Sequence, residues 1–575
     1  MSQAVSLQTG GELLAATLRA AGVEKIFAVH GGHLESFYKG CGDHQVELVD
    51  FRHESSAGHA AEAYARLTGK IGVCVVTSGP GFTNAISAMA NAHLDCIPTL
   101  FIVGAPPLRE METNVLQGGL DQVAMALPTV KWAQRVTNTE RIPDLTAMAI
   151  RQAMSGRRGA TLIEVPIDIL HMSVAADRAT PAAGLHPAPR PAASDADLRV
   201  ALEMLRSAAR PAIICGVEAG FASCGEELTA FVEAARIPVF STARGAGVLR
   251  SDHPLNGQMA ANLASLQGEE RPDVIMLLGA RLGFRLGGRS GSIVPHDAKV
   301  IQIFSDAAEI GRIRDIDLPV VADSGVFVRQ LLSAANSDKW PERGEWSRRV
   351  ADAHKALDLR YADREGPGGI HPYHAAKAAI TAAGRDPILV LDGGESASWA
   401  AFHARIDTPG SLMGLGYLGC LGTGPGQAIG AQMVCPDRRV LQVTGDGAMG
   451  FHLAEFDIMV RRKLPIMTVI LNNQVWGMSI HGQQIMYGAD YHAISKLGGT
   501  DYAAIASAFG CHAERVTAHD EIGPACERAW RSGLPSCIEI MIDPDVVHPV
   551  TIAALGAAPA GEGVTMIPYY ENIPS

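Results

Sequence analysis

Two short apolar runs in the C-terminal third, each followed at once by small polar residues, most constrain what this chain can fold into. The first run, VLQVT, ends at Gly445-Asp446-Gly447, and the second, IMTVIL, ends at Asn472-Asn473. Between the second glycine and the first asparagine lie 24 residues, a suitable length for one crossover helix. The pattern therefore predicts two neighbouring parallel strands in a strand–helix–strand unit.

Asp446 and Asn473 are the side chains that this arrangement brings together. The carboxyl ends of parallel strands meet at one edge of a sheet, where ligands of α/β proteins bind. A carboxylate and an amide oxygen form the kind of site that Mg²⁺ prefers, with substrate phosphates completing its coordination. Gly445 and Gly447 let the backbone approach such phosphates closely, and the next helix offers free N–H groups. A GDG turn or an Asn pair alone would equally fit an ordinary turn, so the prediction depends on their spacing.

Strand-like runs alternate with helix-period segments along most of the chain, which implies parallel sheets covered on both faces. The prediction is an α/β protein of three consecutive doubly wound parallel-sheet domains. The expected boundaries are a first domain at 1–172, a linker at 173–197, a central domain at 198–338, a weakly structured linker at 339–370, a third domain at 371–552 and a C-terminal tail or lid at 553–575.

Composition narrows the class of protein. With 47% hydrophobic and 19% charged residues, the chain can bury large cores. A net charge of −12 without a long basic run argues against nucleic acid and membrane surfaces as partners. The ten scattered cysteines show no metal-site spacing and indicate free thiols. Without a signal-peptide pattern or an apolar run of membrane-spanning length, we expect a cytoplasmic protein.

Several segments carry a resemblance to a known family. HGGHLESFY, RHESSAGHAAEAYAR, LAEFD and NNQVWGM resemble, in this order, the thiamine-diphosphate enzymes of the pyruvate oxidase/acetolactate synthase superfamily, and within it benzaldehyde lyase. The resemblance covers nearly the whole chain. It implies pyrimidine-binding, central and diphosphate-binding domains, the cofactors thiamine diphosphate and Mg²⁺, and a dimer or tetramer whose sites combine two subunits. The central segment has no GxGxxG turn, so ADP or FAD binding there stays open.

The same resemblance implies roles for individual residues. Glu54 would activate the cofactor through a hydrogen bond to its pyrimidine ring, in a water-poor setting. His33 and Gln117, with His30 in a weaker role, would line the reaction site. Asp446, Asn473 and the backbone carbonyl of Val475 would hold the metal. The expected cofactor-binding residues are Glu54, Gly393, Gly394, Glu395, Gly419, Leu421, Gly445, Asp446, Gly447, Ala448, Asn473, Val475 and Trp476.

The expected substrate pocket departs from that of benzaldehyde lyase. Its positions are Gly32, Ile167, Ala397, Leu415, Met478 and Gly482. Four of them, Ile167, Ala397, Leu415 and Gly482, stand where benzaldehyde lyase has Trp, Tyr, His and Phe. Each loss of an aromatic ring removes on the order of 100–200 Å² of contact surface for an aromatic substrate. The resemblance therefore implies a reaction type and leaves the substrate open.

The implied activity is that of a thiamine-diphosphate- and Mg²⁺-dependent carbon–carbon lyase or carboligase. It would cleave or form 2-hydroxy ketones (acyloins) via an enamine intermediate. Two alternatives stay open: a 2-hydroxyacyl-CoA lyase that releases formyl-CoA and an aldehyde or ketone, and an acetolactate-synthase-like condensation of 2-oxo acids. The tail GAAPAGEGVTMIPYYENIPS contains apolar residues that fit either a packed segment or a lid.

Overall fold

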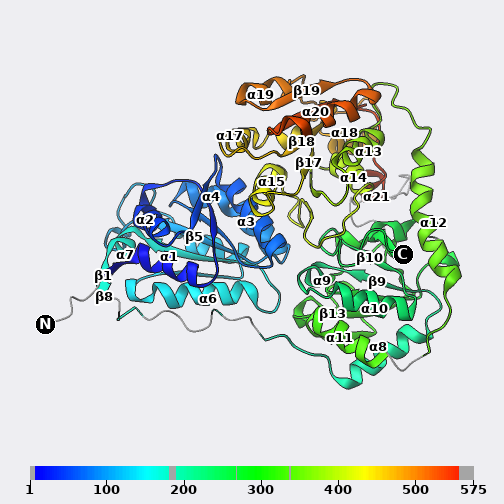
Figure 1. Cartoon of the computed structure of the whole chain (residues 1–575), viewed down its shortest axis with the longest axis horizontal. Coiled ribbons are helices and arrows are strands. Elements are labelled where there is room, and N and C mark those ends of the chain that lie inside the picture. The colour runs from blue at the N-terminus through cyan, green and yellow to red at the C-terminus, as the bar shows by residue number, and fades with distance from the viewer. Residues whose placement is uncertain are drawn as a thin grey trace. The chain divides into compact units, whose positions relative to one another are not determined.

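The computed structural model describes residues 7–175, 177–179, 185, 189–266, 268–335 and 339–555. The tail from residue 556 onward, with its expected role as a lid, lies outside the described residues. The chain forms two compact units (Figure 1). Unit 1 comprises Met1–Pro189, Leu415–Asp437 and Gly450–Ile466, and unit 2 comprises Arg190–Gly414, Arg438–Met449 and Met467–Ser575.

Unit 1 contains a six-stranded parallel sheet in the order β3-β2-β4-β5-β7-β6. Its strands are β2 (Lys25–Ala28), β3 (Glu47–Asp50), β4 (Gly72–Val76), β5 (Thr99–Ala105), β6 (Trp132–Arg135) and β7 (Ala160–Pro166). A separate antiparallel pair joins β1 (Leu7–Thr9) to β8 (Ser173–Ala175). The helices of unit 1 include α1 (Gly10–Ala20), α2 (Glu35–Asp43), α3 (Glu54–Thr68), α4 (Pro80–Leu94), α5 (Gln122–Ala126), α6 (Ile142–Met154), α7 (Ile167–His171), α15 (Thr423–Val434) and α17 (Phe456–Arg461).

The sheet of unit 1 is buried on both faces, as its continuous apolar strands require. Leu100 and Ile102 of β5 point into a core shared with α1, α2 and α6. Phe101 lies on the opposite face, next to Gly58 of α3: a Cβ on this glycine would stand 3.1 Å from the phenyl ring. Helix α15 packs on α3 at equally close range. A Cβ on Gly426 would lie 2.4 Å from the carbonyl oxygen of Ser56, so glycine permits this approach.

Unit 2 contains two further six-stranded parallel sheets, in the orders β11-β10-β9-β12-β13-β14 and β16-β15-β17-β18-β20-β19. The strands of the first are β9 (Pro211–Cys215), β10 (Val239–Ser241), β11 (Asn256–Met259), β12 (Val274–Leu278), β13 (Lys299–Phe304) and β14 (Leu318–Val321). Those of the second are β15 (Ile388–Asp392), β16 (Leu412–Gly414), β17 (Val440–Gly445), β18 (Met467–Asn472), β19 (His512–Val516) and β20 (Ser536–Met541).

Helices of unit 2 include α8 (Asp195–Ser207), α9 (Val217–Phe221), α10 (Gly225–Ala235), α11 (Ser324–Ala335), α12 (Gly344–Tyr361), α13 (Pro372–Ala383), α14 (Glu395–Ala401), α16 (Asp446–Met449), α18 (Gly477–Tyr487), α19 (Tyr502–Phe509), α20 (Ile522–Ser532) and α21 (Pro549–Leu555). With three parallel sheets and their covering helices, the predicted α/β fold class is confirmed.

Two expected linkers differ from the structure. The segment 339–370 was expected to be weakly structured, but it contains the 18-residue helix α12. Trp346 and Val350, one helical turn apart, are buried in the core beside the β9–β14 sheet. Helix α8 begins at Asp195, inside the expected linker 173–197, and Ser194 caps it by accepting a hydrogen bond from the N–H of Asp197. In both helices the buried apolar residues lie among charged residues, which obscures the helical periodicity in the sequence.

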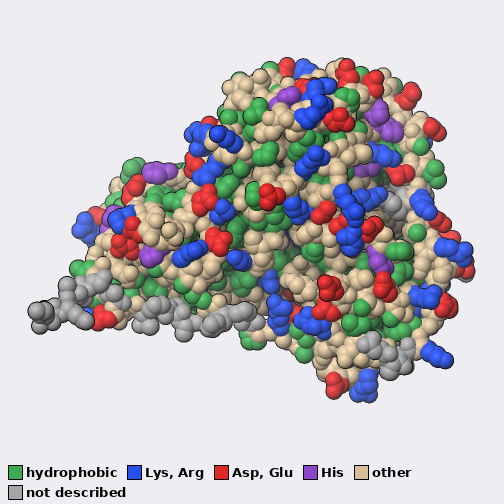
Figure 2. Space-filling view, in the orientation of Figure 1, with side chains coloured by type: hydrophobic (Ala, Val, Ile, Leu, Met, Phe, Trp, Pro, Cys, Tyr) green, Lys and Arg blue, Asp and Glu red, His purple; other side chains and the backbone are tan. Residues whose placement is uncertain are grey.

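Acidic and basic side chains alternate over the face shown in Figure 2, without a large patch of one sign. Within the described part of the chain, no helix has both the length and the apolar character that a bilayer crossing needs.

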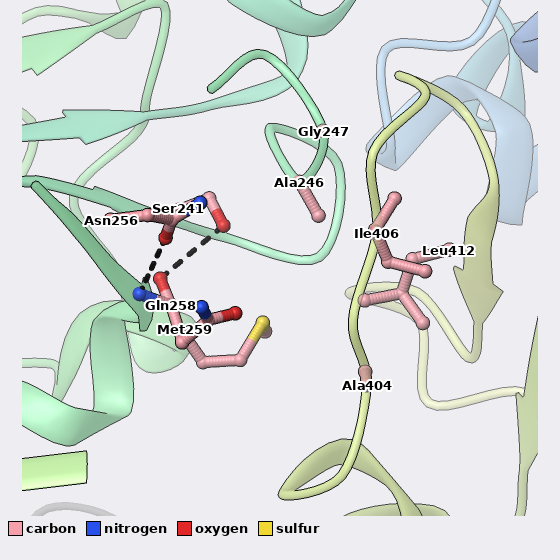
Figure 3. A pocket seen from close by; sticks show the side chains of 9 residues that line it. All are labelled: Ser241, Ala246, Gly247, Asn256, Gln258, Met259, Ala404, Ile406 and Leu412. Atoms are coloured by element: carbon pink, nitrogen blue, oxygen red, sulfur yellow. Dashed lines mark hydrogen bonds between the residues drawn. The ribbon is translucent and has the colours of Figure 1, made fainter. Parts of the chain in front are cut away.

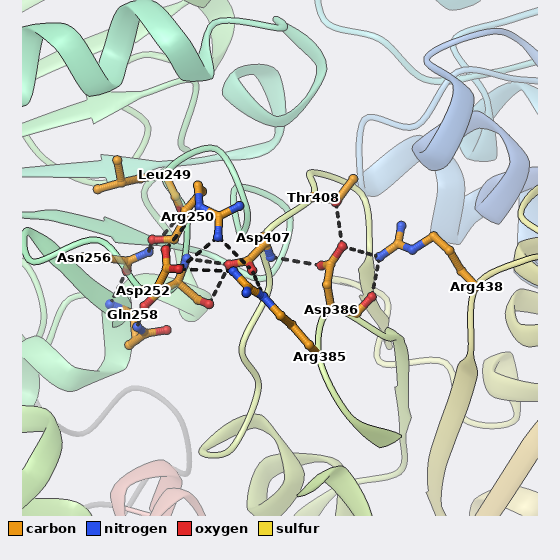
Figure 4. Close-up of polar contacts among 11 residues, drawn as sticks. Leu249, Arg250, Asp252, Asn256, Gln258, Arg385, Asp386, Asp407, Thr408 and Arg438 are labelled. Atoms are coloured by element: carbon orange, nitrogen blue, oxygen red, sulfur yellow. Dashed lines mark hydrogen bonds and ion pairs between the residues drawn. The ribbon is translucent and has the colours of Figure 1, made fainter. Parts of the chain in front are cut away.

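Ion pairs join the two sheets of unit 2 around Asp407 (Figure 4). The Asp407 carboxylate accepts hydrogen bonds from the N–H and Oγ of Ser251, at 2.9 and 2.6 Å. Arg250 approaches it to 3.6 Å and Arg385 to 3.8 Å, and both arginines also pair with Asp252. These contacts fix the central sheet to the C-terminal sheet within this unit.

Candidate functional site

Asp446 and Asn473 follow adjacent strands, as the sequence pattern predicts. β17 and β18 run parallel, with Gly445 opposite Leu471, so both polar residues lie at the same edge of the sheet. Asp446 is only 3% exposed, and its carboxylate accepts hydrogen bonds from the backbone N–H groups of Gly447 and Gln474. Burial raises the pKa of Asp446 to about 7, against these hydrogen bonds, which lower it. A cation bound here would keep the carboxylate ionised.

The loop after β18 presents oxygen atoms beside this carboxylate. Asn473 Oδ1 accepts a hydrogen bond from the N–H of Val475 at 3.3 Å. The loop is fixed from outside, because Trp476 N–H donates to the carbonyl of Ser495 at 2.8 Å. Asn472, by contrast, is buried, and its Nδ2 donates a hydrogen bond to Glu539 at 2.7 Å. The carboxylate of Asp446, the amide oxygen of Asn473 and the carbonyl of Val475 form an all-oxygen set that fits Mg²⁺.

Glycines shape the space next to this set. Gly393 has a φ of +102°, and a Cβ there would lie 3.3 Å from the backbone nitrogen of Gly445 and 3.7 Å from Ala448. A Cβ on Gly447 would lie 2.5 Å from the ring of Trp476. Helices α14 and α16 begin at this point, and the first N–H groups of a helix bind phosphate oxygens well. The cradle therefore fits the diphosphate that the resemblance implies.

The side chain of Glu395, expected among the cofactor-binding residues, makes other contacts. It is 6% exposed and accepts hydrogen bonds from His481 Nδ1 at 2.8 Å, from the N–H of His548 at 3.3 Å and from Thr551 Oγ1. Its carboxylate thus ties α14 to α18 and α21. A role of Glu395 in binding the diphosphate would therefore fall to its backbone.

Unit 1 holds the expected activating acid. Glu54 is the first residue of α3, and its Oε2 accepts a hydrogen bond from Asn84 Nδ2 of α4 at 3.0 Å. Its other oxygen lies over Gly81, where a Cβ would stand 3.6 Å away. The side chain is half-buried. Asn84 is the last residue of the segment SGPGFTN, and the sequence alone assigns it no role.

His33, Thr77 and Gln117 form a hydrogen-bonded group at the same sheet edge. His33 Nδ1 lies 3.2 Å from Thr77 Oγ1, which donates to Gln117 Oε1 at 3.4 Å. Burial lowers the pKa of His33, and a hydrogen bond with Gln117 partly offsets this. Gln117 has a left-handed φ of +59°, a strained conformation that its carbonyl's hydrogen bond from Ser78 Oγ at 2.7 Å helps to hold.

His30 lies outside this group. Its exposed ring pairs with Glu35 at 2.9 Å and rests against Tyr38. Gln122, which the sequence does not single out, supports the turn beneath Gln117 instead. It is 2% exposed, accepts a hydrogen bond from the N–H of Gly79 at 2.8 Å and donates to Glu164 at 2.8 Å.

The loop with Gly419 and Leu421 belongs to unit 1, together with Glu54. Asp95, fully buried at the end of α4, accepts a hydrogen bond from the N–H of Tyr417 at 3.0 Å. Asp95 also pairs with Arg66 of α3 at 3.6 Å. A buried charge thus holds the start of the loop on which Gly419, at a φ of +71°, and Leu421 stand.

The six expected pocket positions are divided between the units. Unit 1 contains Gly32, Ile167 and Leu415, and unit 2 contains Ala397, Met478 and Gly482. Met478 lies beside the diphosphate cradle, since a Cβ on Gly394 would stand 3.3 Å from its side chain. Gly482 is buried inside α18, and Ala397 packs on the core of the C-terminal sheet.

A hollow in unit 2 lies apart from these residues (Figure 3). It is lined by Ser241, Ala246, Gly247, Asn256, Gln258, Met259, Ala404, Ile406 and Leu412. Its cavity volume is only about 10 Å³. That is about the room that one water molecule needs, so this hollow cannot hold a diphosphate cofactor.

Comparisons with known proteins bear on the whole chain. Residues 8–125 match the thiamine pyrophosphate enzyme N-terminal TPP binding domain, residues 198–331 the central domain, and residues 392–540 the C-terminal TPP binding domain. A protein named acetolactate synthase large subunit from Mycobacterium tuberculosis is 32% identical, covering 94% of this chain and 96% of its own. The acetolactate synthase isozyme 2 large subunit of Escherichia coli is 30% identical, covering 93% and 95%.

The first and last of these matches include Glu54 and Asp446, respectively. The chain therefore belongs to the thiamine pyrophosphate enzymes of the pyruvate oxidase/acetolactate synthase superfamily, and its cofactor is thiamine diphosphate, with Mg²⁺ as the usual partner metal.

Proposed function

We propose that this enzyme is a carboligase of the acetolactate-synthase type, which joins two 2-oxo acids with loss of carbon dioxide. The observation that carries this proposal is the near-full-length similarity to proteins named acetolactate synthase, together with an intact Glu54 half and Asp446 half. This was the second alternative from sequence, and the similarity favours it over the acyloin lyase reading.

The chain's own residues have distinct tasks in such a reaction. The bound cofactor supplies the carbon nucleophile and the electron sink. Asp446, Asn473 and the Val475 carbonyl would hold Mg²⁺, while the backbone at Gly393 and Gly394 would bind the diphosphate. Glu54, supported by Asn84, would hold a proton at the pyrimidine ring. His33 and Gln117 would bind the substrate oxygen and move a proton to it.

A second candidate, cleavage or formation of acyloins as in benzaldehyde lyase, has one observation in its favour. The side chains of His33, Thr77 and Gln117 are bonded to one another, and the lowered pKa of His33 leaves all three uncharged at neutral pH. At a neutral, half-buried surface, an uncharged 2-hydroxy ketone loses less hydration energy than a carboxylate does.

One incubation separates these candidates. The enzyme with thiamine diphosphate and Mg²⁺ receives pyruvate, benzoin or a 2-hydroxyacyl-CoA in parallel. Two pyruvates and one proton should give one acetolactate and one carbon dioxide, both of which can be quantified. Aldehyde release from benzoin without turnover of pyruvate would replace the first candidate with the second. Release of formyl-CoA alone would refute both.

We further propose that the enzyme acts in the cytoplasm as a dimer or a dimer of dimers, in which Glu54 of one copy and Asp446 of the other serve the same cofactor. The segment around Gln117 supports self-association, because it exposes Met111, Leu116, Leu120, Met125 and Leu127, with Leu116 84% accessible. Exposed apolar side chains gathered in one segment are typical of an interaction surface. Ten free thiols, eight of them buried, fit a reducing compartment.

A further inference from the structure

Glu455 is a fully buried carboxylate that contacts the backbone next to Glu54. It ends the 3-10 helix η9 (Leu453–Glu455), in the crossover between Asp446 and Asn473. Its Oε1 accepts a hydrogen bond from the N–H of His53 at 3.1 Å, and its Oε2 accepts one from the N–H of Arg52 at 3.3 Å. These two amides immediately precede Glu54, so both oxygens of Glu455 are bonded to the residues that lead into α3.

The geometry of these bonds fixes the direction in which the chain enters the helix. The amides at a helix N-terminus lack partners within the helix, and a carboxylate that accepts them also interacts favourably with the helix dipole. His53 is the N-cap residue of α3. Two bonds to consecutive amides restrain both position and rotation of the peptide before Glu54, which a single bond would not. Burial raises the pKa of Glu455 to about 7, while the bonds from Arg52 and His53 lower it.

Other contacts already attach the crossover segment to the stretch of chain before α3, so Glu455 is not needed for that attachment alone. Asp457 pairs with the Arg52 side chain at 2.8 Å, and Arg461 pairs with Asp50 at 2.8 Å. Arg462 donates to the carbonyl of Leu48 at 2.6 Å. These contacts lie at the more exposed flank and attach the same segment to the same stretch of chain. The hydrogen bonds to Glu455, by contrast, orient the peptide groups immediately before the first residue of α3.

We propose that Glu455 is a positioning residue for Glu54: by holding the peptide groups of Arg52 and His53, it sets where the Glu54 carboxylate stands. This inference rests on the role proposed for Glu54. The segment that joins the two metal-binding positions of the chain would thereby also orient the activating acid of that same chain.

The test compares Glu455→Gln with Asp457→Asn in the full-length enzyme. Both substitutions remove one negative charge from the same segment, but only Glu455→Gln places an amide N–H₂ against backbone N–H donors. Because small misplacements of catalytic groups cost up to about 100-fold in rate, we expect kcat of Glu455→Gln to fall about tenfold or more. The Kd of thiamine diphosphate, from tryptophan fluorescence, should change less than about twofold, and Asp457→Asn should keep kcat near the wild-type value.

Two further measurements separate positioning from general support. In a Glu54→Asp background, which keeps a carboxylate but moves it, Glu455→Gln should lower kcat by a smaller factor than in the wild type, because its effect passes through the position of the Glu54 carboxylate. Hydrogen exchange of the peptide containing Arg52 and His53, measured on the apo enzyme, should speed up in Glu455→Gln and not in Asp457→Asn. The hydrogen-exchange measurement needs no substrate. If the wild-type enzyme proved inactive on every substrate, the proposed function would be refuted, but the exchange result would still test the contact between Glu455 and the amides of Arg52 and His53.

The proposal is overturned if Glu455→Gln keeps the wild-type kcat, if both variants lose kcat equally, or if Glu455→Gln loses cofactor affinity together with kcat. Should Glu455→Gln fail to fold, Glu455→Asp takes its place. That variant keeps the charge but shortens the reach, and the same kcat loss with retained cofactor affinity is expected.

Discussion

Asn84 Nδ2 lies 3.0 Å from Glu54 Oε2, so a side chain from α4 holds the acid at the start of α3. Replacing Asn84 with Leu removes the donor while keeping a similar volume. We expect kcat to fall about tenfold, because Glu54 then samples other rotamers. The matched control is Thr83→Ala, one position earlier, whose hydroxyl bonds only to the carbonyl of Pro80 at 3.2 Å. Equal kcat in Asn84→Leu and wild type would show that Asn84 does not position Glu54.

Asp446→Asn should abolish metal-dependent cofactor binding. The substitution keeps the shape of the buried side chain but removes the charge that a divalent cation requires. Wild-type enzyme should show a thiamine-diphosphate-induced quench of tryptophan fluorescence, because Trp476 lies beside Gly447, and EDTA should reverse it. Asp446→Asn should show no quench at any Mg²⁺ concentration. A quench that persists in this variant would place the metal elsewhere.

The pair of His481 and Glu395 makes stability depend on pH. Burial lowers the pKa of His481, but the hydrogen bond and charge of Glu395 outweigh it, so the pKa lies above 6.5 in the folded state. The stabilisation is then fully present below pH 6.5 and is lost as the pH rises through the folded-state pKa. The difference in Tm between wild type and His481→Gln should therefore shrink with rising pH. A difference that grows would mean that the neutral form is favoured.

Arg343 should be a major stabiliser of the central sheet's helices. Its buried guanidinium donates to the carbonyls of Leu205, Arg206 and Ala208 at the end of α8, and to that of Ala235 at the end of α10. Arg343→Ala leaves these buried acceptors unpaired, which should cost about 3 kcal/mol.

Urea unfolding measures the loss of stability in Arg343→Ala. Arg343→Lys should recover little, because one ammonium cannot reproduce the planar fork. Arg348→Ala, exposed on the same helix, is the control and should stay within about 0.5 kcal/mol of wild type. A small effect of Arg343→Ala would indicate that water satisfies the carbonyls.

The features that the sequence predicts well are those set by residues close together in the chain. The strands β17 and β18 are apolar runs that end in small polar residues, and parallel pairing then places Asp446 and Asn473 at one edge without further information. The α/β class follows from the same alternation. Helix α12 escaped notice because only Trp346 and Val350 mark its buried stripe among charged neighbours.

The supporting partners could not be predicted, because they are brought together only by the fold. Asn84 is 30 residues from Glu54, and Glu455 is 402 residues from the amide of His53 that it accepts. Neither spacing belongs to a helix or strand period. The side chain of Glu395 likewise contacts α18 and α21. Its hydrogen bond from Thr551 joins residues 156 positions apart in the chain, which only the fold brings together.

The most direct test of the account is complementation between two inactive chains. Glu54→Ala and Asp446→Ala carry different tags, are co-expressed, and the doubly tagged dimer is purified. If each cofactor uses Glu54 of one copy and Asp446 of the other, one of the two sites in this dimer is intact, and we expect about half the wild-type specific activity, with both parent dimers inactive. A mixed dimer as inactive as its parents would contradict the shared site.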